Sequence, residues 1–454
     1  MPVGVIGGAF PYTFSLSNAP SGMTINSRTG VITWINPQTS ASNIVVTVYD
    51  KDGDFTTATW SITVTDSTDD FIFVNSSYSG TETGSITQPY NSVQDIMDLG
   101  SAALNKIVYY RSGSYAVPND NSTYVGGATG CGLSADGGRA HIWIGYPGES
   151  VTFNMSGVNA SYATWFEAID GTDATLNGIW FENVTIQSPR RAGWWLYNVD
   201  YFTMYNCTID DCLWNDSGGN PGGVKIMDNT GPFSYYNYIV DSNFTDFTTA
   251  HGIGSLYHTN KMLIERNLIS GQSANPYTLP AIAIKDGNQY ITVRKNQVVG
   301  YDRAIAESLN AVFYKCLYNE ICYNYFAEQT GGFNRDGNQG TTWLYRNTIV
   351  GNLTFENIGE GSCEGPWYLE NNVLQNSATG GITYYYNCGS NPSSCLNLAS
   401  NLNASSGIVD ASGNLQGDYT SYLGTAGWQI DESEYYGTPP STPTITGVMT
   451  GSIR

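Results

Sequence analysis

Basic residues are scarce in this sequence. Its 454 residues include 18 lysines and arginines against 39 aspartates and glutamates, which gives a formal net charge of −21. So negative a field repels nucleic acid and anionic membranes, and we expect neither as a partner. With three histidines and no nucleotide-binding glycine motif, the sequence gives no support for a dinucleotide site, a phosphate-binding loop or a Ser-His-Asp triad.

Long apolar runs are also missing. No stretch of about 18 apolar residues occurs, so insertion into a membrane is not expected. The first residues, "MPVGVIGGAFPYTF", lack the basic start and the apolar core of a secretory signal. We therefore expect either an excised fragment of a longer protein or a protein that reaches its place without secretion, as a virion component would.

The cysteines and acidic clusters lack clear metal-ligand spacing. No CxxC pair or Cys/His combination occurs among the 8 cysteines, so no structural zinc is expected. The even count permits disulfides, with Cys388 and Cys395 as the best pair, and is equally compatible with buried thiols. The stretch "DKDGD", Asp50 to Asp54, could bind calcium or form a solvated turn. No cofactor is required by any motif.

Glycine and tyrosine are abundant, at 51 and 33 residues, whereas only 13% of residues are charged. This composition is typical of an all-β extracellular protein. Residues 1–67 hold short alternating strands broken by turns, as in "PYTFSLSNAPSGMTINSRTGVITW", which predicts a small β-sandwich. This segment resembles the Ig-like modules of bacterial surface proteins.

An internal repeat dominates the rest of the chain. Short alternating strands followed by an asparagine recur at a step of about 25 residues, with the asparagine at positions 183, 206, 243, 267, 296, 319, 347 and 372. Such a period without a helical pattern predicts a β-solenoid whose rungs stack to bury their apolar faces. Recurrent asparagines at one corner fit a ladder of side-chain amides along the stack.

These repeats resemble the rungs of the right-handed parallel β-helix proteins, the pectate-lyase-like superfamily. The segment "PYNSVQDIMD…KIVYYRSGSY" resembles that superfamily's N-terminal cap helix, expected over 90–104, and its first rung. The fold expected is thus all-β: an Ig-like β-sandwich, then a right-handed parallel β-helix over 70–437, then a linker over 438–454. The resemblance implies lyases, glycoside hydrolases, phage tailspikes or non-enzymatic adhesins, because the superfamily contains all four.

Aligning the rungs places several polar pairs in one column. The column contains Tyr257/His258, Lys285/Asp286, Glu307/Ser308 and Arg335/Asp336, on strands about 4.8 Å apart. For a polysaccharide lyase, Lys285 would be the base, Arg335 the group that neutralises a uronate, and Tyr257 or His258 the acid. For a hydrolase, the carboxylates Asp286, Glu307 and Asp336 would act in pairs. The plainest alternative is a ladder of alternating charges on a solvated face.

Further residues fit carbohydrate binding. Aromatic faces stack on sugar rings, and a basic pair holds a carboxylate or sulfate; the candidates are Trp194, Trp195, Trp214, Arg190 and Arg191. Core packing and a solvated turn are the alternatives for them. We expect a protein of the cell surface, extracellular space or virion that binds and cleaves a polysaccharide, with lyase chemistry favoured. The rival is a non-catalytic adhesin or phage fibre, and a tailspike-like chain would form a homotrimer.

Overall fold

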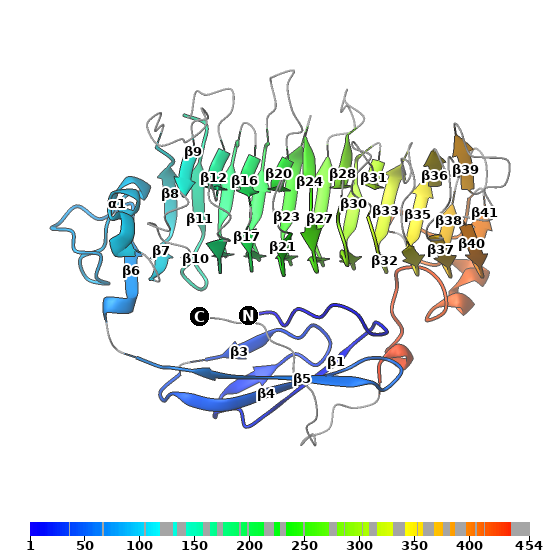
Figure 1. Ribbon diagram of the computed structural model, residues 1–454, viewed down its shortest axis with the longest axis horizontal. Helices are drawn as coiled ribbons and strands as arrows, with labels where there is room; N and C mark the ends of the chain where they lie inside the picture. Colours follow the sequence, from blue (N-terminus) through cyan, green and yellow to red (C-terminus); the bar gives the residue numbers. More distant parts are fainter. Residues whose placement is uncertain are drawn as a thin grey trace. The chain divides into compact units, whose positions relative to one another are not determined.

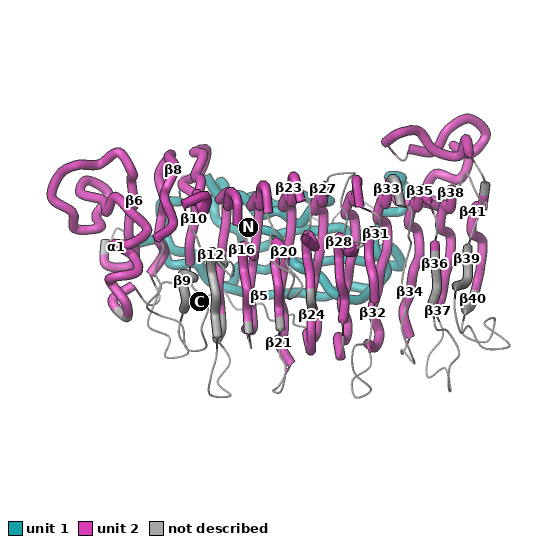
Figure 2. Tube along the Cα trace, turned by 90° about the horizontal axis from the view of Figure 1, so that it is seen from above, with its two compact units in different colours: residues 1–68, 429–454 teal, residues 69–428 magenta. Residues whose placement is uncertain are grey.

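The computed structural model describes residues 1–35, 37–65, 68–103, 106–118, 130–133, 142–157, 164–169, 176–189, 192–197, 199–212, 222–227, 233–247, 250–271, 279–285, 287–301, 303–307, 316–329, 341–351, 353–356, 367–375, 382–385, 396–404, 406–412 and 414–436. The chain forms two compact units, one made of Met1–Thr68 with Gln429–Arg454 and the other of Asp69–Trp428 (Figure 2).

The first unit is an Ig-like module. Strands β1 (Thr13–Ser17), β4 (Ala41–Tyr49) and β5 (Phe55–Ile62) form an antiparallel sheet in the order β1-β4-β5, and β2 (Met23–Ile25) pairs with β3 (Ile32–Trp34). Met23, Ile32 and Ile44 form one buried apolar cluster of this unit. The alternation in the sequence places these residues on one face of each strand, which explains why the segment folds as a sandwich.

Residues from Gln429 onward also belong to this first unit. The short 3-10 helix η5 (Glu432–Glu434) lies here, and Arg28 of the N-terminal part donates to Glu432 at 2.6 Å. The Arg28 guanidinium lies 3.9 Å from the ring centre of Tyr435, and the Tyr436 ring stacks on Tyr49 at 5.3 Å. The β-helix thus occupies the chain between the two parts of the Ig-like unit and ends before residue 437, the boundary expected from the sequence.

The second unit is a parallel β-helix made of three long sheets (Figure 1). The largest sheet has 12 strands: β6 (Phe71–Val74), β7 (Ile107–Tyr110), β10 (Ile142–Gly145), β14 (Trp180–Glu182), β18 (Thr203–Tyr205), β22 (Tyr238–Val240), β26 (Leu263–Glu265), β29 (Thr292–Arg294), β32 (Asn319–Cys322), β34 (Thr342–Tyr345), β37 (Trp367–Glu370) and β40 (Leu396–Ala399). The next has 11 strands: β8 (Gly113–Ala116), β11 (Val151–Asn154), β15 (Thr185–Gln187), β19 (Thr208–Asp210), β23 (Asn243–Phe247), β27 (Leu268–Gly271), β30 (Gln297–Val299), β33 (Tyr325–Gln329), β35 (Thr348–Gly351), β38 (Val373–Gln375) and β41 (Leu402–Ala404).

The third sheet has 7 strands: β9 (Gly130–Leu133), β12 (Thr164–Ile169), β16 (Ala192–Tyr197), β20 (Gly222–Met227), β24 (His251–Leu256), β28 (Pro280–Ile284) and β31 (Arg303–Glu307). Three two-stranded pairs complete the rungs: β13 (Leu176–Asn177) with β17 (Val199–Asp200), β21 (Ser234–Tyr235) with β25 (Thr259–Asn260), and β36 (Leu353–Glu356) with β39 (Ile382–Tyr385). All these strands pair in parallel, each with its equivalent on the next rung.

A short helix covers the first end of the stack (Figure 1). Helix α1 (Val93–Asp98) is shorter than the expected 90–104 and is followed by the 3-10 turn η2 (Gly100–Ala103). Ser92 and Asp95 form its capping box, and Val93, Ile96 and Met97 are buried in the core of the β-helix. A stack of rungs has an open apolar end, and this helix closes it.

Two adjacent positions at one corner repeat along the described rungs from β14 to β41. The first has a left-handed backbone, with φ between 50° and 57° at residues 183, 206, 241, 266, 295, 323, 346, 371 and 400. The second holds a ladder in which each asparagine amide donates to the next oxygen at 2.9–3.1 Å, through Asn267, Asn296, Asn324, Asn347, Asn372 and Asn401. Both positions favour asparagine, the first because its side chain tolerates positive φ.

The predicted asparagine ladder is therefore correct in kind but not in every member. Asn183 and Asn206 occupy the left-handed position instead, and Asn243 is exposed on β23. Asn319 belongs to a different turn, where its oxygen accepts from the backbone of Ile291. Asn324 takes its place in the ladder.

Candidate functional site

The candidate site lies on the side of the seven-stranded sheet that points away from the core, hereafter the outer face. Val224 and Ile226 of β20 are core residues, so Lys225 between them points outward. On the neighbouring strands, Lys225 pairs with Trp195 on one side and with Gly254 on the other. Three rungs thus present an indole, an ammonium group and a glycine in one row.

Lys225 and Trp195 form a buried cation–π pair. The lysine Nζ lies 4.0 Å from the indole ring centre, and the two residues are 3% and 5% exposed. A desolvated ammonium group held over an indole is fixed in position more firmly than one on a solvated surface. The sheet therefore carries an immobile positive charge on its outer face.

Lys285 follows the last residue of β28 and adds a second cation. Its backbone N–H donates to the carbonyl of Leu256 at 2.9 Å, which sets Lys285 beside Tyr257 on the adjacent rung. Its Nζ lies 5.8 Å from the Tyr257 ring centre, and the residue is 8% exposed. The predicted neighbourhood of Lys285 and Tyr257 is thus present.

His251 begins β24 and completes the cluster. Its Nδ1 lies 2.6 Å from the carbonyl oxygen of Pro280 on the next rung, and the residue is 1% exposed. Burial above all, together with the positive charges of Lys285 and Lys225, lowers the pKa of the imidazole to about 3, although the Pro280 hydrogen bond acts in the opposite direction. The two lysines and the histidine therefore act on one another electrostatically.

Glu307 lies outside this row. It pairs with Ile284, a core residue, so its side chain points to the inner side of the sheet, where it is fully buried. Asn319 donates to it at 2.5 Å and Thr342 Oγ1 lies 3.3 Å from each of its oxygens. These contacts describe a carboxylate that ties adjacent rungs together.

The remaining predicted residues divide by the direction of their side chains. Trp194 is a core residue packed on Phe181 at 5.2 Å, whereas its neighbour Trp195 lies on the outer face, because successive strand residues point to opposite sides. His258 is buried with its ring 6.0 Å from that of Phe233. Asp286, Ser308, Arg335, Asp336, Arg190, Arg191 and Trp214 lie outside the described residues.

Sequence reasoning missed Lys225 and His251. The stretches "GGVKIM" and "HGIGSL" contain the signal, which is a polar residue in an apolar strand next to glycines. Glycine inside a strand marks a place where another group approaches the backbone closely. The longest interval between repeats, from 206 to 243, contains the first of these strands and hid its alignment with the later rungs.

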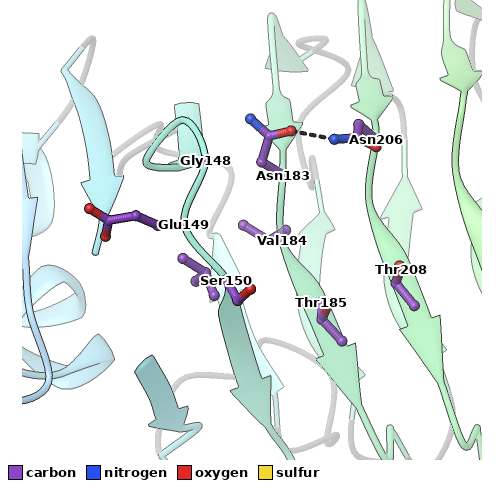
Figure 3. Close-up of a pocket in the computed structure, with 9 residues that line it drawn as sticks. Gly148, Glu149, Ser150, Asn183, Val184, Thr185, Asn206 and Thr208 are labelled. Carbon is purple, nitrogen blue, oxygen red and sulfur yellow. Dashed lines mark hydrogen bonds between the residues drawn. The ribbon is translucent and has the colours of Figure 1, made fainter. Parts of the chain in front are cut away.

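A hollow lies near the corner of earlier rungs, away from the outer-face residues described above (Figure 3). It is polar, with Asn206 donating to Asn183 at 2.5 Å, and is lined by Gly148, Glu149, Ser150, Val151, Asn183, Val184, Thr185, Asn206 and Thr208. Its one titratable side chain, Glu149, accepts from Arg111 at 2.6 Å, and this hydrogen bond lowers the pKa of the carboxyl. The hollow therefore lacks a group that could accept or donate a proton near neutral pH.

On and beside the 12-stranded sheet, two arginines and two acidic residues form a connected series of ion pairs. Arg266 contacts Asp241 at 2.6 Å and Glu265 at 3.0 Å, and Glu265 contacts Arg294 at 2.7 Å. Burial opposes ionisation of Glu265, but the two arginines outweigh it and lower the pKa of this carboxyl. The charges pair with one another, so we assign the chain a structural role.

Metal binding and thiol chemistry have little support in the part of the chain that the structure describes. No cluster of three or more His, Cys, Asp or Glu side chains suited to a metal occurs there. The Asp50 carboxylate accepts backbone N–H groups of Ala9, Asp52 and Asp54 at 2.9–3.0 Å, as in a turn. Burial raises the pKa of the Cys207 thiol to about 12, so this cysteine is unreactive.

Comparisons with known proteins support the two-part fold. Residues 2–65 match the family described as "Putative Ig domain". A rhamnogalacturonan lyase structure aligns with a TM-score of 0.51 at 9% identity, over 78% of this chain and 96% of that one. The tailspike protein 3 of bacteriophage CBA120 aligns at 11% identity over 78% and 64% (TM-score 0.37), and pectate lyase Pel9A at 13% over 83% and 88% (TM-score 0.36).

A search of curated protein sequences finds no match. The chain therefore carries an Ig-like domain at its N-terminus and a parallel β-helix whose fold is similar to that of the rhamnogalacturonan lyase structure. Within the described residues, no helix has the length and apolar character needed to cross a membrane.

Proposed function

We propose that the chain binds an acidic polysaccharide on the outer face of the seven-stranded sheet and cleaves it by β-elimination. The observation that carries the proposal is the placement of Lys225, Lys285 and His251 on adjoining rungs: Lys225 pairs with Gly254, the His251 side chain packs against Gly254, and Lys285 lies beside Tyr257. Two of the chain's seven lysines are buried here, on or beside the strands that flank β24. A lysine ammonium group is a suitable partner for an anionic group on a ligand.

The reaction needs three groups, and the outer face offers a candidate for each. Lys225, fixed over Trp195, would neutralise the uronate carboxylate and so stabilise the carbanion beside it. Lys285 would remove the proton from the carbon next to the carboxylate, since burial and a neighbouring cation are the conditions in which lysine serves as a base. Tyr257 would give its proton to the leaving glycosidic oxygen as the carbon–oxygen bond breaks and a carbon–carbon double bond forms.

Hydrolysis by paired carboxylates has less support. Glu307 is fully buried and hydrogen-bonded by Asn319 and Thr342, so it does not present a carboxylate to a sugar on the outer face. A retaining or inverting mechanism needs two carboxyl groups flanking one bond. We therefore favour the lyase over the hydrolase, and over an adhesin that would bind without cleaving. Such a protein would meet its substrate outside the cell or at a virion surface.

The test is incubation of the whole chain with polygalacturonate, alginate, rhamnogalacturonan and unsulfated chondroitin. Wild type is compared with Lys285→Ala, and ultraviolet absorbance of the unsaturated product is read together with reducing ends. We expect both signals to rise with one substrate and to fall at least about 100-fold in the variant, as is usual for loss of a general base. Lys261→Ala is the matched control, because Lys261 contacts Tyr236 at a corner of the rung.

The outcomes separate the candidate functions. Reducing ends without absorbance would contradict elimination and turn attention to hydrolysis. If the Lys285 and Lys261 variants lost activity equally, the loss would come from the change in overall charge and not from a specific role of Lys285. Binding without either signal would leave a carbohydrate-binding protein that is not an enzyme.

A further inference from the structure

We propose that Nε2 of His251 accepts a hydrogen bond from a hydroxyl group of the bound sugar, which makes this histidine a specificity-determining residue of the site. The inference rests on the proposed carbohydrate site and adds to it the neutral group that the site recognises beside the anion. Three observations about the imidazole and its surroundings carry the inference.

The first observation fixes the tautomer of the ring. A carbonyl oxygen only accepts hydrogen bonds, so the 2.6 Å contact between Nδ1 and the Pro280 oxygen requires the proton to be on Nδ1. Nε2 then carries a lone pair and can only accept. The low pKa of the imidazole keeps it in this neutral form throughout the physiological range.

The second observation is that Nε2 is buried and, among the described residues, meets no hydrogen-bond donor. Buried nitrogen and oxygen atoms in proteins nearly always have a partner, and the exceptions call for a water, an ion or a functional role. An acceptor that Pro280 keeps in one orientation, and to which the described residues offer no donor, is suited to a donor that arrives with a ligand.

The third observation is that the His251 side chain packs directly against the backbone of a neighbouring glycine. Gly222 pairs with His251 on the preceding rung, and Gly254 lies three residues further along β24. A Cβ atom at Gly254 would stand 2.6 Å from His251 Cβ and 2.7 Å from its Cδ2, so no other residue fits there without movement. The pairing of β24 with β28 also shifts register between Ile253 and Leu256, so the rung is irregular at this point.

The chemistry of the surroundings identifies the donor as a neutral hydroxyl. A lone pair repels a carboxylate or sulfate, which Lys225 and Lys285 would hold instead. Sugar rings carry hydroxyl groups next to such anions, and a site with a buried acceptor discriminates strongly against ligands that cannot fill it. The site would therefore select a sugar with an anion and a free hydroxyl, and reject one whose hydroxyl is acetylated or methylated.

The test uses nitrogen NMR on the whole chain, because its three histidines give few signals. The signal of His251 is assigned by its loss in His251→Gln and followed during titration with short oligosaccharides of the four polysaccharides named above. We expect an Nε2 shift typical of hydrogen-bond acceptance. In parallel, calorimetry should show that His251→Phe weakens binding at least about tenfold, whereas His251→Gln, which keeps an acceptor oxygen, stays within about threefold.

The failures of the two proposals are distinguishable. Binding without a change at Nε2, or equal weakening by Phe and Gln, would overturn the role of His251 and leave the carbohydrate site standing. The absence of binding to every oligosaccharide would overturn both. Thermal unfolding of both variants shows whether a loss of binding reflects a loss of fold, and the NMR shift in the wild-type chain decides the question if the Phe variant is unfolded.

Discussion

His251 is held without charge between two lysines, and this arrangement couples its protonation to folding. In the unfolded chain, its pKa would return to about 6.5, whereas in the folded chain the pKa is about 3. Between these values the unfolded chain binds a proton that the folded chain does not. The contribution to stability is therefore complete above about pH 6.5 and is lost as the pH falls toward 3.

We predict that wild type loses about 2 kcal/mol more stability than His251→Gln when the pH is lowered from about 7 to about 5. Glutamine does not titrate, so the variant removes this contribution and leaves the acidic groups unchanged. Denaturant unfolding of both proteins at the two pH values measures the difference. If lowering the pH reduced the stability of both proteins equally, His251 would be protonated in the folded chain or reached by solvent.

The corner of the β-helix depends on a hydrogen-bonding element that spans several rungs. The Asn324 oxygen accepts from the backbone and the side chain of Asn296, and its amide donates to Asn347 and to the carbonyls of Val293 and Cys322. Every one of these groups is buried. Removing the side chain leaves several of them unsatisfied at once.

We predict that Asn324→Ala destabilises the β-helix by about 2–4 kcal/mol. Asn243→Ala is the control, because Asn243 is exposed on β23 and its loss should change stability by no more than about 0.5 kcal/mol. Denaturant unfolding followed by circular dichroism measures both variants. Similar values for the two would mean that water replaces the ladder at little cost.

The repeats predicted the fold from sequence because apolar alternation and a corner asparagine recur in nearly every rung. The exact register was harder to predict, since a shift of one residue turns a strand side chain to the opposite face. Glu307 shows this: the sequence predicts it in one column with Lys285, whereas in the structure it pairs with Ile284, one residue earlier, and points inward. The turns differ in length between rungs and carry no periodic signal. The residues of the outer-face row could therefore be identified only from the structure.

At the scale of the whole molecule, the segment from Gln429 onward contacts the N-terminal part of the Ig-like unit. The aromatic and cation–π contacts of Tyr435 and Tyr436 with Arg28 and Tyr49 link segments about 400 residues apart in the chain. The Arg28–Glu432 ion pair is largely exposed and adds little. The stacked rings should therefore supply most of the stabilisation.

We predict that Tyr436→Ala weakens the Ig-like unit by about 1 kcal/mol, because it removes the ring stacked on Tyr49. Amide hydrogen exchange of β4 and β5, followed by mass spectrometry, should become about five times faster. Tyr422→Ala, in the exposed turn η4 (Gly417–Tyr422) of the other unit, serves as control. Unchanged exchange in the Tyr436 variant would show that the tail rests on the module without stabilising it.

The corner ladder also bears on how such a chain can change its length during evolution. Each ladder asparagine offers its neighbour the same donor and acceptor, so a DNA duplication that begins and ends at this corner would insert one complete rung with both of its junctions already satisfied. A duplication whose length is not a whole number of rungs would turn core residues outward. Gene segments one rung long are therefore natural units of recombination, and relatives of this chain should differ in length by whole rungs.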